Sequence, residues 1–480
     1  MAKQTYMGLR GERLIIAMIT TEVFPAYFLL GYNNSVMGGL LSLESFATQF
    51  PQADTLNTSG KQIAHNSLGC MIGALCCYKI GDRFGRLRII AAGAILSIIG
   101  SILLSSSFSL AQFIVGRVIL GCGMGFMSAT VPVWQAESSP AERRGALMVL
   151  EGAFVTVGLF VSQFVDLGLF FAQGSVSWRF PLALPIVPLI MILGCLPFFP
   201  DSPRWLVKVG RIEEARNLLA VLADVDISSP VIEEDIYKIR RSLDVMSQGK
   251  FADLLRNGDD RLLNRTLLAL FSTFSQQVNG IGVVGSYTAD IFIQFIGLSA
   301  IQARILSGSL YVWQLLCCSV TFHAIDRMGR RALMIIGVSG IGTMTAILAG
   351  MVSNPDNKAC SIIATIAVFL LATFFGVGAL GVNYLYGTEV APLAYRAPVY
   401  ALSTTTLWSF NFLVVEVIYF FLPETRKISL EDVDAIFRNA KDPFEVVRIA
   451  RSMSSTYTGT SHAENYEISV ENGPKNPEDG

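Results

Sequence analysis

Long runs of apolar residues, separated by short polar segments, dominate this chain. Each run is close to the roughly 20 residues that a helix needs to cross about 30 Å of hydrocarbon. Lipid offers the backbone no hydrogen-bond partners, so every run is predicted to be helical and the fold all-α. The eleven candidate spans are 14–40, 61–80, 87–107, 111–134, 147–171, 180–199, 265–296, 303–325, 332–352, 361–387 and 399–422.

The composition supports a polytopic membrane protein. Of the 480 residues, 52% are hydrophobic and 15% are charged, and the formal net charge is −1. Soluble domains carry about 25% charged residues, so a soluble core and a nucleic-acid binder are both disfavoured. The first apolar run is long and has no small-residue cleavage site, so we interpret it as a span and not as a signal peptide.

Cysteine and histidine give no sign of cofactor chemistry. Seven of the eight cysteines lie in apolar runs, and only Cys360 falls in a candidate outer loop. His65 and His323 lie on spans without a metal-ligating neighbour at helical spacing. We therefore expect no metal and no cofactor. Since no nucleophile–base set is evident either, we do not expect an enzyme.

The distribution of basic residues predicts the orientation. Loops near 83–88, 143–144 and 327–331 carry several arginines, and the loops between them carry almost none. Positively charged loops stay in the cytoplasm, so the N-terminus and segment 201–264 are expected to face the cytoplasm. The membrane is expected to be the plasma membrane. Segment 201–264 is polar and is predicted to form short amphipathic helices.

Three landmarks of the first half recur in the same order in the second half. Gly81–Arg86 reappears as Asp326–Arg331, Glu137 as Glu389, and Pro200–Arg204 as Pro423–Arg426. A duplicated helical bundle with a midplane site between its copies is an alternating-access architecture. The predicted divisions are a six-helix bundle at 1–200, linker helices at 201–264, a second bundle at 265–437 and a disordered polar tail at 438–480.

The chain resembles the sugar porter family of the major facilitator superfamily, and fungal hexose transporters in particular. The resemblance implies a two-bundle membrane carrier of hexose-type sugars, acting as a monomer in the lipid bilayer without a nucleic-acid partner. The matching stretches are Gly31–Gly39, Gly81–Arg86, Gly116 to Glu137, Arg144-Gly145, Pro200–Leu206, Gln276–Ile281, Asp326–Arg331 and Pro423–Arg426.

The same resemblance implies a polar substrate site at the midplane. An amide carries both a donor and an acceptor, which suits sugar hydroxyls, and an aromatic face can stack on the C–H side of the ring. A lone intramembrane glutamine can equally hold two helices together, but the resemblance favours binding for the adjacent pair Gln276 and Gln277. The implied residues are Gln163, Gln276, Gln277, Gln314, Trp408 and Asn411.

Charged residues near the cytoplasmic ends are predicted to form a gating network of ion pairs. Charges at this depth are costly unless they are paired. Simple positive-inside charge is the alternative explanation. The predicted members are Asp82, Arg83, Arg86, Arg117, Glu137, Arg143, Arg144, Asp326, Arg327, Arg330, Arg331, Glu389 and Arg396.

Several positions depart from the family pattern. Asn33 stands where many proton-coupled relatives carry an aspartate. An amide cannot titrate, so we expect facilitated or weakly coupled transport. The other departures are Gly152, Gly282 and Gln314 for usual amides, and Gly381, Asn383 and Tyr384 for a Pro-x-Pro-Trp that breaks the tenth span.

The second half is shorter than the first by about one span. Asp82 and Asp326 are 244 positions apart, whereas Pro200 and Pro423 are only 223 apart. Two half-spans are therefore predicted to be fused into one continuous helix over 399–422, which leaves five helices and an uncovered groove in the second bundle. We expect weak or absent transport as a result. A non-transporting sugar sensor or a degenerate paralogue on the same fold is the alternative.

Glycosylation tests the predicted orientation. Asn57-Thr58-Ser59 is an acceptor sequence in the first outer loop, whereas Asn264-Arg265-Thr266 is expected on the cytoplasmic side. We predict a glycan on Asn57, seen as a mass shift that is removed by glycosidase and absent in Asn57→Gln. A glycan mapped to Asn264 would mean that the orientation is inverted.

Overall fold

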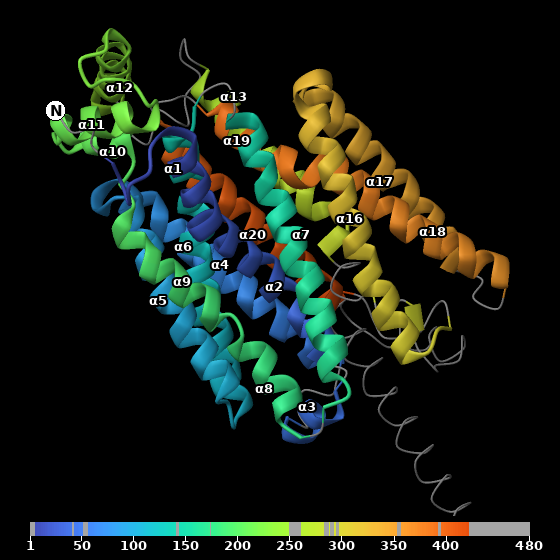
Figure 1. Cartoon of the computed structure of the whole chain (residues 1–480). Coiled ribbons are helices and arrows are strands. Elements are labelled where there is room, and N and C mark those ends of the chain that lie inside the picture. Colours follow the sequence, from blue (N-terminus) through green and yellow to red (C-terminus); the bar gives the residue numbers. More distant parts are fainter. Residues whose placement is uncertain are drawn as a thin grey trace, which may run out of the picture. The chain divides into compact units, whose positions relative to one another are not determined.

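The computed structural model describes residues 5–40, 43–50, 56–140, 144–172, 174–248, 261–282, 288, 292–293, 297–352, 357–391 and 395–421. Helices account for nearly all of them, and one isolated antiparallel bridge joins Tyr6 and Leu9. Figure 1 shows the helices in chain order. Met1–Phe412 forms one unit, and Leu413–Gly480 forms another, in which the end of the last helix is described.

In the first half of the chain, helices lie at all six predicted positions, and five of them are long and apolar enough to cross a membrane. The first span contains a short π-helix, η1 (Ile19–Val23), in which each hydrogen bond reaches one residue further than in an α-helix. A short helix, α3 (Glu44–Gln49), follows it. The remaining helices of this half are α1 (Gly11–Met18), α2 (Phe24–Leu40), α4 (Leu56–Phe84), α5 (Arg86–Ser105), α6 (Leu110–Ser138), α7 (Arg144–Leu169), α8 (Val176–Ala183), α9 (Ile186–Cys195) and the 3-10 turn η3 (Leu196–Phe198).

Glycines allow α4 and α6 to pack backbone against backbone. A Cβ atom added at Gly121 would lie 2.2 Å from the carbonyl oxygen of Asn66, and one added at Gly125 would lie 2.2 Å from that of Cys70. In lipid there is no hydrophobic drive between helices, so small residues that permit close approach supply the packing energy. Gly31 and Gly158 bring α2 and α7 together in the same way.

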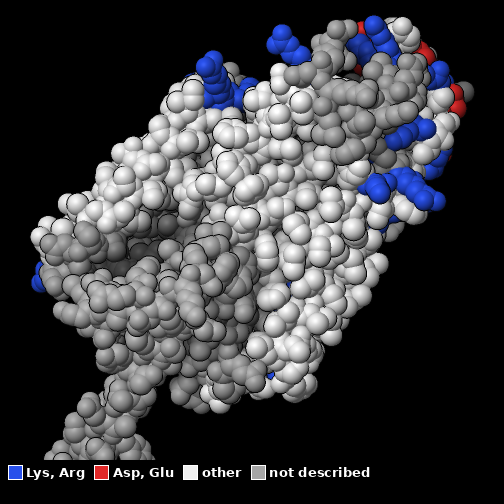
Figure 2. Space-filling view, turned by 180° about the vertical axis from the view of Figure 1, so that it is seen from behind, with Lys and Arg blue, Asp and Glu red and all other residues white. Residues whose placement is uncertain are grey.

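The polar segment after Pro200 forms three helices, α10 (Pro203–Lys208), α11 (Ile212–Leu222) and α12 (Pro230–Gln248). They have an apolar core of their own, in which Trp205, Leu206 and Leu218 are buried. The N-terminal segment is tied to them, because Arg10 Nε lies 2.8 Å from Asp224 Oδ1. In Figure 2 the charged side chains gather toward one end, and the broad face beside them carries few charges.

The second half contains α13 (Leu262–Val278), α16 (Ala300–Met328), α17 (Arg330–Val352), α18 (Lys358–Phe375), η5 (Gly376–Leu380), α19 (Gly381–Val390) and α20 (Arg396–Phe421). The predicted continuous helix over 399–422 is confirmed up to Phe421, because α20 runs without a break. That this helix fuses two half-spans stays a prediction. Pro423–Arg426 and the tail at 438–480 lie outside the described residues.

The predicted number of spans is only partly established. Among the described residues, eight helices are long and apolar enough to cross a membrane. Helices α4, α13 and α20 occupy three further predicted positions but are not among the eight. The seventh predicted span, 265–296, contains an interruption: α13 ends at Val278, and Gly280 adopts a φ of +80°, which a helix does not allow.

The tenth span keeps an irregular turn although its prolines are replaced. Residues Gly376–Leu380 form the π-helix η5 between α18 and α19. Thr321 of α16 donates to the carbonyl oxygens of Gly376 and Val377, at 3.0 and 3.1 Å. Residues Lys358–Gly387 nevertheless form one continuous helix, so this span has an irregular π-turn and no break.

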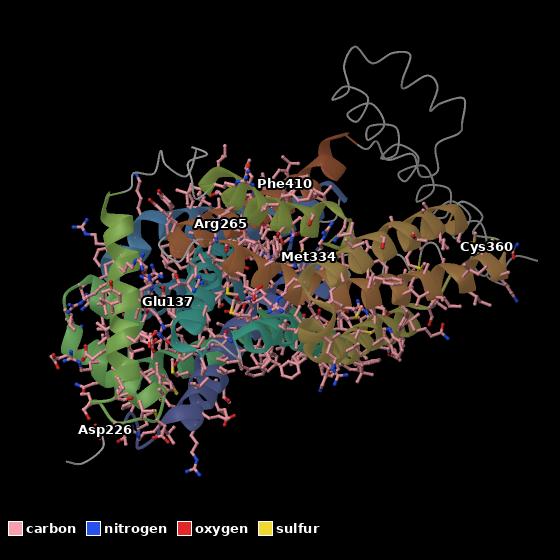
Figure 3. All side chains as sticks on the ribbon, turned by 90° about the horizontal axis from the view of Figure 1, so that it is seen from above. Glu137, Asp226, Arg265, Met334, Cys360 and Phe410 are labelled. Carbon is pink, nitrogen blue, oxygen red and sulfur yellow. The ribbon has the colours of Figure 1, made fainter. Side chains whose placement is uncertain are left out.

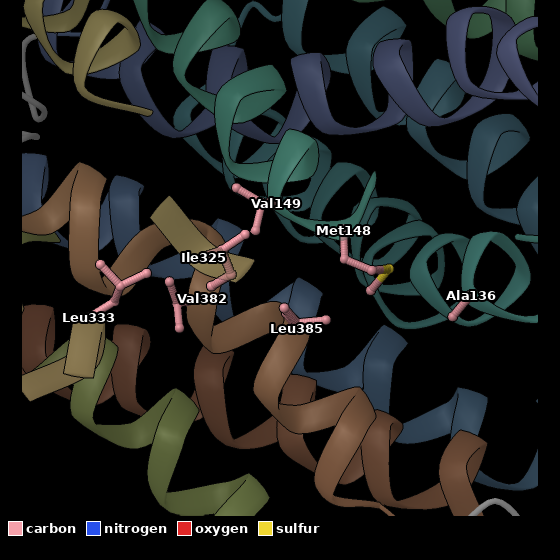
Figure 4. Close-up of a cluster of buried hydrophobic side chains, with 7 residues drawn as sticks. All are labelled: Ala136, Met148, Val149, Ile325, Leu333, Val382 and Leu385. Atoms are coloured by element: carbon pink, nitrogen blue, oxygen red, sulfur yellow. The ribbon is translucent and has the colours of Figure 1, made fainter. Parts of the chain in front are cut away.

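An apolar cluster joins the two halves near the start of α7 and the end of α16. Met148 and Val149 of α7 pack with Ile325 of α16 and with Val382 and Leu385 of α19 (Figure 4). A Cβ at Gly381 would lie 3.0 Å from the carbonyl oxygen of Val149, so the two backbones nearly touch. This contact is the inner seam between the halves.

A groove of about 790 Å³ opens between α13 and α20 on the second half. Phe271, which is 63% exposed, and the edge-to-face pair Phe274–Phe410 line it. A groove was expected where a sixth helix of the bundle would pack. That this one marks a lost helix stays a prediction.

Candidate functional site

The predicted network contains a buried ion pair between α5 and α6. Arg86 Nε and Nη2 donate to the two carboxylate oxygens of Glu137 at 3.2 and 3.3 Å, and both side chains are less than 5% exposed. Arg86 Nη1 also donates to the carbonyl oxygen of Gly81 at 3.1 Å. This bidentate geometry holds the start of α5 against the end of α6, which carries Glu137 (labelled in Figure 3).

Asp201 stabilises the start of α5, beside this ion pair. Its Oδ1 accepts the backbone N–H groups of Arg86 and Ser202, at 3.0 and 2.7 Å. Burial raises the pKa of Asp201 above its usual value, while these hydrogen bonds and the charge of Arg86 oppose the rise. Asp201 therefore ties the first linker helix to the turn between α4 and α5.

The second half repeats the ion pair. Arg330 Nε and Nη2 donate to the carboxylate oxygens of Glu389 at 3.1 and 3.0 Å, and Nη1 reaches the carbonyl oxygen of Ile325 at 3.4 Å. The acceptor again lies five residues before the arginine. The side chains are 28% and 36% exposed, so this copy is accessible to water.

The structure describes five other predicted members of the network: Arg83, Arg117, Arg327, Arg331 and Arg396. Arg117 was placed at the same membrane face as Glu137, which is wrong: both lie on α6, 20 residues apart, or about 30 Å along the helix. Arg83, Arg327 and Arg331 are exposed, and Arg396 is the first residue of α20. Arg143 and the side chains of Asp82, Arg144 and Asp326 lie outside the described set.

Two of the implied binding residues, Gln277 and Asn411, belong to a chain of hydrogen bonds that links the two halves. Asn411 Nδ2 of α20 donates to Gln277 Oε1 of α13 at 2.8 Å. Asn411 Oδ1 accepts from Ser67 Oγ of α4 at 2.5 Å. Polar groups from both halves are therefore joined through Asn411.

Trp408 and Gln314 make two further bonds between the halves. Trp408 Nε1 of α20 donates to Ser128 Oγ of α6 at 3.2 Å. Gln314 Nε2 of α16 lies 3.4 Å from Thr156 Oγ1 of α7. Both residues are less than 5% exposed. Their partners are weak hydroxyl acceptors, which a sugar hydroxyl can replace.

Three other amide side chains differ in how many of their hydrogen bonds are made: Gln276, Gln163 and Asn33. Gln276 is 2% exposed, and its Oε1 has no hydrogen-bond partner within the described part of the chain. Gln163 Nε2 donates to Ser35 Oγ at 2.7 Å inside the first half. Asn33 Nδ2 donates to the carbonyl oxygen of Leu29 at 3.0 Å, one turn earlier on α2.

Sequence reasoning missed three buried carboxyl groups. Glu22, Glu151 and Asp166 are at most 3% exposed, and none of their carboxyl oxygens has a hydrogen-bond partner among the described residues. All three stand within apolar runs, and an ionisable residue in a span is a functional candidate by default. That signal was present in the sequence.

Two helical halves with matching ion pairs and polar bonds between them define a membrane carrier of the major facilitator type. The structure resembles that of XylE, a proton:xylose symporter solved with 6-bromo-6-deoxy-D-glucose, with a TM-score of 0.74 and 22% identity over 92% of this chain and 94% of XylE. XylE from E. coli in a partially occluded inward-open state gives a TM-score of 0.69. These likenesses show the fold.

The chain belongs to the sugar transporter family. The pattern of the family described as "Sugar (and other) transporter" matches residues 18–418. The sugar transporter STL1 of Saccharomyces cerevisiae is 32% identical over 94% of this chain and 86% of its own length. The low-affinity glucose transporter HXT1 of the same yeast is 25% identical over 91% of this chain and 84% of its own length. The chain is thus a membrane transporter and not an enzyme.

The two ion pairs are predicted to differ in their contribution to stability. Glu137→Gln leaves Arg86 buried without its counter-charge, which should cost about 3–5 kcal/mol. Glu389→Gln removes an exposed pair and should cost about 0–1 kcal/mol. Thermal unfolding of the purified proteins measures both. Equal losses of stability would show that burial does not determine how much each ion pair contributes to stability.

Gln277→Ala is predicted to weaken sugar binding by about 1–3 kcal/mol, because it removes an amide and leaves Asn411 Nδ2 without its acceptor. Equilibrium binding of labelled glucose to purified protein provides the measurement. Ser275→Ala is the matched control, since Ser275 Oγ bonds only to the carbonyl of Ser272 on the same helix. Unchanged affinity in a folded Gln277→Ala protein would remove this residue from the site.

Proposed function

We propose that this protein carries hexose-type sugars across the plasma membrane by alternating access, as a monomer with its N-terminus in the cytoplasm. The observation that supports this best is the hydrogen-bonded chain Gln277–Asn411–Ser67, which links the two halves. The protein satisfies these polar groups with one another, and a sugar that offers equivalent hydroxyls can take over the same bonds at small cost.

The unsatisfied Oε1 of Gln276 supports a binding role for this region. An unpaired buried acceptor costs about 1–3 kcal/mol, and a ligand hydroxyl would recover that energy. The names of the relatives favour sugars: HXT1 is a glucose transporter, and XylE is a xylose symporter. We infer a hexose-type substrate on these two grounds.

The contacts between the halves suggest how access alternates. On the inner side the seam is the apolar cluster around Val149, Val382 and Leu385. Beside it, each half is closed by its own ion pair, Arg86–Glu137 or Arg330–Glu389. Separating the halves breaks only weak apolar contacts, while each ion pair keeps its own half rigid.

Position 33 contributes no proton to this cycle. The Asn33 side chain is an amide, and its Nδ2 is occupied by the carbonyl oxygen of Leu29. We therefore propose facilitated or weakly coupled transport, in which any coupling uses another group. The short second half is the reason to expect low activity.

Labelled-hexose uptake by a transporter-null cell tests this function. We expect slow, saturable uptake from the chain, faster uptake from a version with a restored twelfth span, and reduced uptake from Gln277→Ala. Binding of glucose without uptake in either form would favour the sugar sensor. Absence of both binding and uptake, with the protein correctly inserted, would contradict the carrier proposal.

A further inference from the structure

Glu151 lies on α7 and is fully buried. Neither of its carboxyl oxygens has a hydrogen-bond partner among the described residues. It stands between Val149 and Gly152, the two α7 residues whose backbones approach Gly381 of the second half. Glu151 is therefore at the junction of the two halves, next to the inner seam.

Three tyrosines from other helices surround this carboxyl group. Tyr27 of α2, Tyr384 of α19 and Tyr400 of α20 are the titratable groups that the structure records facing Glu151. The rings of Tyr27 and Tyr384 meet edge to face, with 6.0 Å between centroids. The hydroxyls of Tyr27 and Tyr400 also have no hydrogen-bond partner within the described residues. These three tyrosines, called the cage below, therefore come from both halves of the protein.

A carboxylate in such a place is costly. An isolated buried charge is strongly disfavoured, and the tyrosine hydroxyls offer dipoles but no positive charge. The neutral acid fits better, because it can both donate to and accept from the surrounding hydroxyls. If the halves separate, water reaches the cage and hydration stabilises the ionised carboxylate. The protonation of Glu151 is therefore linked to the state of the interface.

We propose that Glu151 is a proton-binding site that couples proton movement to sugar transport, in place of the aspartate missing at position 33. The group takes a proton when the cage opens to one side and releases it when the cage opens to the other side. In each coupled cycle one proton accompanies one neutral sugar, so one positive charge moves across the membrane. This inference rests on the proposed carrier function.

The other buried carboxyl groups do not share this geometry. Asp166 of α7 faces the guanidinium of Arg304 on α16, which supplies a counter-charge. Glu22 lies in η1, which packs against α6 and α9 of the first half. Glu151 differs from both because tyrosines of both halves form its surroundings. Glu22→Gln is therefore the matched control for Glu151→Gln.

The first test does not depend on transport or on a ligand. Infrared spectra of the purified full chain detect the carbonyl stretch of protonated carboxylic acids. We expect Glu151→Gln to lose one such acid band that the wild type shows at neutral pH and loses at alkaline pH. Tyr384→Phe should shift the pH at which this band disappears. Identical acid bands in the wild type and Glu151→Gln at neutral pH would overturn the proposal.

The second test asks whether the proton is linked to the sugar. Glucose is added to purified protein in weakly buffered solution, and the exchange of protons is followed by a pH indicator. We expect up to one proton exchanged per bound sugar in the wild type and in Glu22→Gln, and a complete loss of exchange in Glu151→Gln. Sugar binding with equal proton exchange in Glu151→Gln and the wild type would refute the linkage. Failure of glucose to bind at all would instead contradict the proposed function, and the infrared result would still decide the proton site.

Discussion

A polar group inside the hydrocarbon layer can form hydrogen bonds only with the protein or with a bound molecule. The arrangement of the spans follows from this constraint. Thr321 supplies donors to the carbonyls of the π-turn at Gly376 and Val377, and Asn33 bonds back to Leu29 on its own helix. Other polar groups find their partner in the other half: Asn411 accepts from Ser67, and Trp408 donates to Ser128. The contact between the halves therefore contains polar groups that bond with one another.

The two copies of the inner ion pair show how one motif takes different roles. In the first half, a Cβ at Gly85 would lie 2.5 Å from Asp201 Oδ2 and 3.1 Å from the ring of Trp205, so linker helix α10 covers this turn. The equivalent Gly329 meets no atom within 4 Å among the described residues. The two glycines share one backbone conformation, with φ of +90° and +79°. Within the described part of the chain, the cover by α10 therefore distinguishes the first pair from the second.

The sequence predicted the helices well, and it predicted local contacts better than distant ones. The repeat of Gly81–Arg86 correctly indicated that Arg86 and Arg330 serve equivalent roles. It could not show that Arg117 lies at the far end of α6 from Glu137, because loop charge does not measure depth within a long helix. The interruption of the seventh span at Gly280 was also missed, because apolar composition continues through a turn whose φ is positive.

By itself, the sequence determined that the chain is helical, that it crosses the membrane many times and that its halves are duplicated, because run length, backbone hydrogen bonding and loop charge act locally. Only the tertiary structure decided which polar residues meet. Asn411 and Ser67 are 344 residues apart in the chain and yet share a hydrogen bond. Glu151 lies near three tyrosines because α2, α19 and α20 pack close to α7 at this point. Such contacts depend on how helices from both halves pack, and no periodicity within one span encodes that packing.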